Sequence, residues 1–154
     1  MSEQSQLSEY FAAIQPALLE WEQAWRAAKK AIRIPSKVGG TKWIETGRQM
    51  AHIAELDEAV AAALASIAPP ERLRKVHTGL VGALRINAKS FSANARDMQA
   101  GLRLNEWSTF KSGTGDAARF KRLVNEWRQQ VKAESQRLDV PIPFRRLWVF
   151  RHSL

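Results

Sequence analysis

Residues able to carry out acid–base or metal chemistry are few in this 154-residue chain. It has no cysteine, and its three histidines are His52, His77 and His152. The cysteine count excludes a disulfide scaffold, a thiolate metal site and a cysteine nucleophile, and three histidines leave few members for a triad or a zinc site. The chain also lacks the Glu-x-x-His, His-Glu-x-x-His and Gly-x-Ser-x-Gly patterns. We therefore expect a protein that is not an enzyme and has no cofactor or metal site.

A glycine-rich segment at 111–116 reads Lys-Ser-Gly-Thr-Gly-Asp. It lacks the Gly-Lys-Ser/Thr ending and the preceding strand of a phosphate-binding loop. The segment therefore predicts a turn before a helix rather than a nucleotide site.

Basic side chains recur at helical spacing in the second half of the chain. One row, about 27 Å long at the helical rise, has four cations and no acid: Arg85, Lys89, Ser92, Arg96, Gln99 and Arg103. A similar row comprises Lys121, Asn125, Arg128, Lys132 and Ser135. If both rows point the same way, they form a cationic face that can follow a phosphate backbone through charge, with little reading of bases. The alternative is that both are ordinary solvated helix faces.

The C-terminal segment 141–154 combines arginines with large apolar residues. Pro141 and Pro143 disfavour a helix there, and the segment either docks nucleic acid, an anionic membrane surface or a protein groove, or folds back on the protein. Two arginines of this segment, Arg145 and Arg146, belong to the predicted polyanion-binding set. The full set comprises Arg85, Lys89, Arg96, Arg103, Lys121, Arg128, Lys132, Arg145 and Arg146.

Polar residues also interrupt two apolar helical patterns. A hairpin closed at Pro69 and Pro70 would place His52 near Asn87 and Asp57 near Arg85. Such pairs fix the register of packed helices. The functional alternative is a polar pocket for a small ligand or an enzyme site, which would use His52, His77, Asn87 and Asp57.

Apolar periodicity of 3.6 residues predicts an all-α fold. The expected helices cover 8–32, 41–68, 70–100 and 116–138. Ser8 and Thr41 are the expected N-caps, Gly101 is the expected C-terminal cap, and Pro16 should kink the first helix or mark its start. A short helical or irregular connection is expected around Trp107 and Phe110. The prediction is an antiparallel four-helix bundle over 1–140, with a long first connection and a C-terminal extension over 141–154.

The net charge of +9 is unevenly distributed along the chain. Residues 1–25 hold four acids and no base, whereas the part after Pro69 has 17 basic and 7 acidic residues. No segment resembles a signal peptide or a membrane span, so a cytoplasmic protein is expected. The leading hypothesis is a non-enzymatic helical binding module with a basic face for nucleic acid or another polyanion. The alternative is a structural or protein-interaction bundle, with a protein partner or self-association through its oppositely charged ends.

Overall fold

The computed structural model describes residues 1–31, 35–104 and 115–151, which form helices and no strand. Four long helices make up most of these ranges: α1 (Glu3–Ala31), α2 (Thr41–Ala65), α3 (Arg74–Gln99) and α5 (Gly115–Leu138). Two short elements are also present, the 3₁₀ turn η1 (Glu71–Leu73) and α6 (Trp148–Arg151). The predicted all-α bundle is confirmed. Within the described ranges, no helix has the length and apolar character needed to span a membrane.

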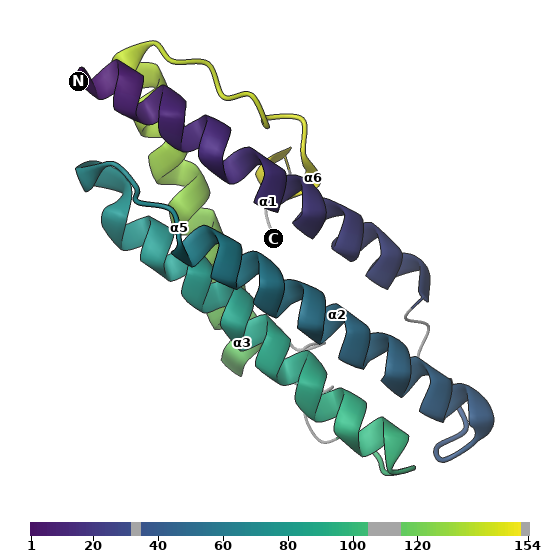
Figure 1. The fold of residues 1–154 in the computed structure, drawn as a ribbon. Coiled ribbons are helices and arrows are strands. Elements are labelled where there is room, and N and C mark those ends of the chain that lie inside the picture. Colours follow the sequence, from purple (N-terminus) through teal and green to yellow (C-terminus); the bar gives the residue numbers. More distant parts are fainter. Residues whose placement is uncertain (32–34, 105–114, 152–154) are drawn as a thin grey trace.

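The four long helices pack as a bundle in which consecutive helices run antiparallel (Figure 1). Contacts link α1 to α2, α2 to α3, α3 to α5 and α5 back to α1, and the α2–α3 contact is the most extensive. The start of α1 lies beside the end of α5, where Gln4 Nε2 donates to the Leu138 carbonyl at 3.0 Å. Arg137 Nη1 also donates to Glu3 Oε2 at 2.9 Å. The first and last long helices are therefore neighbours.

The main core is built from the apolar stripe of each helix, as the periodicity predicted. On α1, the stripe residues Leu7, Phe11, Ile14, Leu18 and Trp21 are each at most 2% exposed. A second, smaller core takes its buried residues from α2 and α3 and comprises Trp43, Met50, Ile53, Ala54, Phe91, Ala95 and Met98.

The N-terminal helix begins earlier than predicted and continues through its proline. α1 starts at Glu3, so Ser8 is an interior residue rather than the N-cap, and residues 8–14 are helical. Pro16 lies inside the helix. A proline there removes one backbone donor. Burial of Ile14 and Leu18 on either side offsets this loss, because packing rather than local propensity supplies most of the stability of a helix.

Three further helix ends differ from the prediction, and one agrees with it. Gly40 is the N-cap of α2 and makes no side-chain cap, so Thr41 is the first helical residue instead. The helix also ends at Ala65 rather than at residue 68. The next α-helix begins at Arg74 rather than at residue 70, because the 3₁₀ turn η1 follows the prolines. Gly101 is the expected cap of α3: its φ is +75°, and the N–H groups of Gly101 and Leu102 donate to the carbonyls of Met98 and Asp97. The predicted connection around Trp107 and Phe110 lies outside the described residues.

Helices α2 and α3 are in tight contact at Gly47. A β-carbon on this residue would lie 2.8 Å from Met98 Cβ, 3.0 Å from the Gln99 nitrogen and 3.1 Å from the Ala95 oxygen. Backbone atoms fill the space that a side chain would need, so only glycine fits without moving the helices.

The described part of the C-terminal extension packs on the bundle. Its buried residues include Phe144, Leu147, Val149 and Phe150. The centroid of the Phe144 ring lies 5.4 Å from that of the Phe11 ring and 6.1 Å from that of the Trp127 ring. The backbone N–H of Trp148 donates to Glu22 Oε1 on α1 at 3.1 Å. Of the two alternatives for the segment, the structure has it folded back on the protein.

Candidate polyanion-binding surface

The predicted row along α3 is exposed over its whole length. Buried residues follow the opposite side of the helix, among them Leu80, Leu84, Asn87 and Met98. The row from Arg85 to Gln99 lies on the other side because its spacings of three and four residues keep it on one face, and Arg103 follows just beyond the end of the helix. Every member is exposed to solvent: Arg85, Lys89, Ser92, Arg96, Gln99 and Arg103. We call these six residues the α3 stripe.

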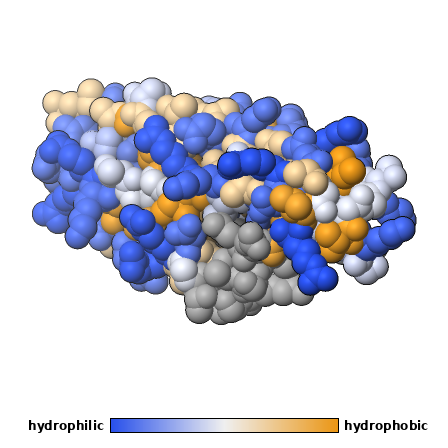
Figure 2. Space-filling view, turned by 90° about the horizontal axis from the view of Figure 1, so that it is seen from below, coloured by the Kyte–Doolittle hydropathy of each residue, from blue (hydrophilic) through white to orange (hydrophobic). Residues whose placement is uncertain are grey.

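Most cations of the α3 stripe have no acidic partner. Arg85 Nε lies 3.7 Å from Glu58 Oε1 on α2, and both side chains are more than half exposed. Such a pair contributes little to stability. Among the described residues, Lys89, Arg96 and Arg103 form no ion pair. Figure 2 shows hydrophilic side chains over most of the face seen from below, with apolar side chains in smaller separate groups.

The row on α5 is not an exposed stripe. Lys121 and Lys132 are exposed, and the Lys132 ammonium lies 5.4 Å from the centre of the Phe150 ring. Arg128, in contrast, is 5% exposed, and its Nη2 donates to Asn125 Oδ1 at 3.0 Å. Its position four residues after Val124 and three before Val131 places it on the buried side of α5, because both valines are fully buried. The sequence left open whether both rows point the same way, and the burial of Arg128 means that the α5 row does not continue the exposed stripe of α3.

The arginines of the extension lie apart from the α3 stripe. Arg145 and Arg146 are exposed between the buried Phe144 and Leu147. In Figure 1 this segment runs beside α1, on the opposite side of the bundle from α3. The structure therefore does not bring the nine predicted cations together on one surface.

The polar residues between α2 and α3 pair differently from the prediction. Asn87 Nδ2 donates to Asp57 Oδ2 at 2.7 Å, whereas His52 is exposed and Arg85 pairs with Glu58 rather than Asp57. The partner of Asn87 on α2 lies five residues after the predicted one, and the partner of Arg85 lies one residue after it. In a helix, each side chain points from its Cα toward the N-terminus of that helix. In the antiparallel pair, an α2 side chain therefore points away from the turn between α2 and α3, and an α3 side chain points toward that turn. The α3 residue that meets a given α2 side chain consequently lies further along α3 than the heights of the Cα atoms alone suggest.

Burial changes the acid–base behaviour of Asp57. The residue is 1% exposed, and burial raises its pKa to about 7, against a smaller lowering by the Asn87 hydrogen bond. The neutral, protonated form of this carboxyl group therefore persists to a higher pH than in an ordinary aspartate.

A second buried network joins α1, α3 and α5 and was not predicted. His77 Nε2 lies 2.9 Å from the Leu64 carbonyl, which can only accept, so Nε2 carries the proton in the neutral ring. His77 Nδ1 then accepts from the Tyr10 hydroxyl at 2.9 Å, and the same hydroxyl accepts from Trp127 Nε1 at 3.2 Å. Burial lowers the pKa of His77 and raises that of Tyr10 to about 12. All these polar atoms are satisfied, which is typical of a structural network.

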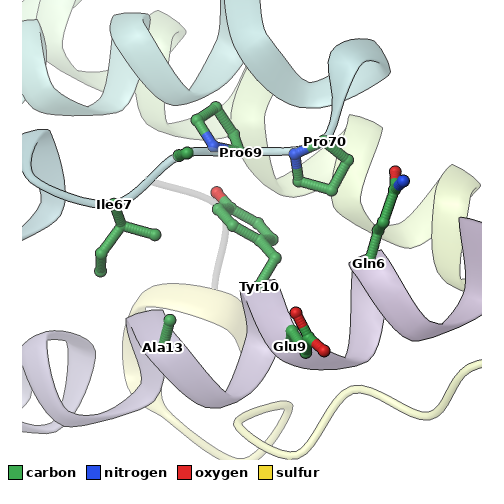
Figure 3. A pocket seen from close by; sticks show the side chains of 8 residues that line it. Gln6, Glu9, Tyr10, Ala13, Ile67, Pro69 and Pro70 are labelled. Carbon is green, nitrogen blue, oxygen red and sulfur yellow. The ribbon is translucent and has the colours of Figure 1, made fainter. Parts of the chain in front are cut away.

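An open groove lies beside this network. Its volume is about 430 Å³, and α1 and the turn between α2 and α3 line it with Gln6, Glu9, Tyr10, Ala13, Ile67, Ala68, Pro69 and Pro70. Figure 3 shows the Tyr10 side chain rising from α1 toward Pro69, with Gln6 and Glu9 along the same helix. No three His, Asp or Glu side chains of the described residues are grouped so that they could hold a metal ion.

Comparisons with protein-family models, curated proteins and solved structures gave no match.

Proposed function

We propose that the protein is a non-enzymatic helical binding module that binds nucleic acid or another polyanion through the α3 stripe. The observation that carries the proposal is the exposure of all six stripe residues, four of them cationic and none acidic. The helix holds Arg85, Lys89 and Arg96 in one line, and the helical part of the stripe, from Arg85 to Gln99, extends over roughly 21 Å at the helical rise. These cations can therefore contact successive phosphates without a large loss of conformational freedom.

The charge along the chain supports the same surface. α3 carries five basic residues and one acid, whereas α2 carries two basic residues and four acids. A polyanion approaching the bundle is attracted to α3 and repelled by α2, which favours one orientation. Since the stripe contains no aromatic residue, binding should depend on charge rather than on stacking with bases.

The alternative, a protein-interaction bundle that docks a partner through its tail, is less well supported. The apolar residues of the extension, including Phe144 and Phe150, are buried against α1 and α5. A partner that bound them would first have to detach the extension from the core.

The test is fluorescence anisotropy with labelled duplex DNA, single-stranded DNA, RNA and heparin over a series of salt concentrations. We expect binding that weakens steeply with salt, because counterions are released from the polyanion. The double variant Lys89→Glu/Arg96→Glu should reduce affinity at least about tenfold at ~50 mM salt. It should also lower the salt slope by about 2, because two cations no longer meet a phosphate.

The matched control is Arg145→Glu/Arg146→Glu, which changes the net charge equally on the other side of the bundle. We expect it to have a much smaller effect than the α3 variant. An equal weakening of binding in the two variants would show that net charge alone matters, and absence of any binding at ~50 mM salt would remove the proposal.

A further inference from the structure

The α2–α3 hairpin has an open end, where α2 begins and α3 ends. Two segments meet there, residues 35–42 and 98–104, and we call them together the open end. A β-carbon on Gly39 would lie 3.4 Å from the Gly101 carbonyl oxygen, so the two backbones are in contact. Figure 1 shows the loop before α2 beside the end of α3 at one end of the bundle.

Two apolar side chains of the open end are exposed to solvent. Val38 is 40% exposed and Leu102 is 57% exposed, and each is the neighbour in sequence of one of the two touching glycines. The backbone of Leu102 is fixed, because its N–H donates to the Asp97 carbonyl at 2.8 Å and its own carbonyl accepts from Trp43 Nε1 at 3.0 Å. The structure therefore presents these two side chains together at the surface.

Positive charges accompany these apolar side chains. Lys37, Lys42 and Arg103 belong to the same two segments, which contain no acid. All three are exposed, and none forms an ion pair with a described residue. Figure 2 shows apolar side chains next to hydrophilic ones at the right-hand end of the molecule, where the open end lies in Figure 1.

We propose that the open end docks the protein on the surface of an anionic lipid bilayer. Val38 and Leu102 enter the boundary between headgroups and hydrocarbon, while the three cations attract the negatively charged headgroups. A bilayer surface offers negative charge above an apolar layer, whereas the phosphate backbone of a nucleic acid offers the charge without that layer. The combination of exposed apolar side chains and unpaired cations therefore fits a lipid surface.

The open end adjoins the α3 stripe but differs from it in chemistry. Arg103 belongs to both surfaces, and the stripe contains no apolar side chain. A vesicle that bound through charge alone would use the stripe and would be insensitive to changes at Val38 and Leu102. Variants of the two surfaces therefore separate lipid docking from polyanion binding.

The experiment is flotation of the full chain with vesicles of phosphatidylcholine alone or of phosphatidylcholine mixed with phosphatidylglycerol. We expect binding to the mixed vesicles and little binding to the neutral ones. Val38→Ser/Leu102→Ser should weaken binding to the mixed vesicles at least about fivefold and leave binding to duplex DNA unchanged, because it removes apolar surface but no charge. Lys37→Glu/Lys42→Glu should weaken vesicle binding at least about tenfold.

Two controls are matched to these variants. Leu19→Ser removes an apolar side chain that is 42% exposed on α1, and it should bind vesicles like the wild type, whereas Leu102→Ser alone should bind them more weakly. Lys89→Glu/Arg96→Glu changes the net charge as much as Lys37→Glu/Lys42→Glu and should have a smaller effect on vesicles. All the substituted side chains are exposed, so the variants should keep the fold, which circular dichroism verifies.

Three results would overturn the proposal. The first is no binding of the wild type to the mixed vesicles. The second is equal binding of the wild type and Val38→Ser/Leu102→Ser. The third is a loss of vesicle binding in Lys89→Glu/Arg96→Glu as large as in Lys37→Glu/Lys42→Glu, which would assign the vesicles to the α3 stripe.

Discussion

Asp57 is buried without a positive charge to balance it. Among the described residues, its side chain has one hydrogen-bond donor, Asn87, and no ion pair. Trp25 from α1, Phe91 from α3 and Ile53 from its own helix surround it with uncharged groups. Its neighbour along α2, Glu58, pairs with Arg85 at the surface. The ionised form is therefore disfavoured in the folded state.

This burial predicts that Asp57 makes the folded protein less stable as the pH rises. The pKa is about 7 in the folded state against 3.8 for an unperturbed Asp, so the folded state binds more protons between these values. The free energy of unfolding should fall by up to about 4 kcal/mol from pH 4 to pH 7 through this residue, and then remain level. Asp57→Asn should be more stable than the wild type at pH 8 and similar to it at pH 4.

Urea denaturation at several pH values checks this prediction. Burial lowers the pKa of His77, which makes stability rise with pH up to about 6.5 and so opposes the effect of Asp57. The difference between the wild type and Asp57→Asn isolates Asp57, and a difference that does not change with pH would contradict the prediction.

At the scale of the helices, replacing two helical glycines by alanine should have opposite effects on the free energy of unfolding. Gly47→Ala places a β-carbon 2.8 Å from Met98 Cβ, beside backbone atoms of α3, so it should destabilise the protein by about 1–3 kcal/mol. Gly82→Ala meets nothing within 4 Å and should stabilise α3 by about 0.5–1 kcal/mol. Denaturation followed by circular dichroism measures both, and a stabilising Gly47→Ala would show that the two helices can separate easily.

The sequence predicted those features of the helices that depend on local spacing. The periodicity of α3 identified both its buried side and its exposed row, and Gly101 marked its end because the cap requires a positive φ. The predicted N-caps at Ser8 and Thr41 are wrong, since α1 begins at Glu3 and Gly40 is the N-cap of α2. Packing stabilises these helices, so a helix can begin at a residue that is not a strong N-cap.

The candidate surface could be predicted only in part, since it depends on contacts between helices. The burial of Arg128 depends on how wide the packed side of α5 is. The Asn87–Asp57 pair depends on the register of α2 against α3, and the position of the extension on the far side of the bundle from α3 depends on the path of the chain after α5. Spacing along the chain contains none of this information.

For the molecule as a whole, the extension should be required for stability. Removing residues 141–154 exposes the surfaces of α1 and α5 that now pack against Phe144, Leu147, Val149 and Phe150. Each large apolar side chain contributes about 1.5–3 kcal/mol when buried, so the truncated protein should lose at least about 4 kcal/mol. Thermal unfolding and dye binding to exposed apolar surface provide the measurement, with Pro143→Ala as a full-length control.

A truncated protein that unfolds at the same temperature as the full chain would contradict this prediction. That result would also support the alternative in which the extension detaches from the bundle and docks a partner.

The packing between the two ends of the chain also determines when the protein can fold during its synthesis. Phe11 of α1 is covered by Phe144, and Glu3 pairs with Arg137. As the ribosome releases the chain from its N-terminus, the α2–α3 pair can assemble as soon as both helices have emerged. The apolar side of α1 gains its final neighbours only after Phe144 and the rest of the extension have emerged. During that interval, the aromatic residues of this side lack part of their packing, and apolar surface left open in a partly folded chain promotes aggregation.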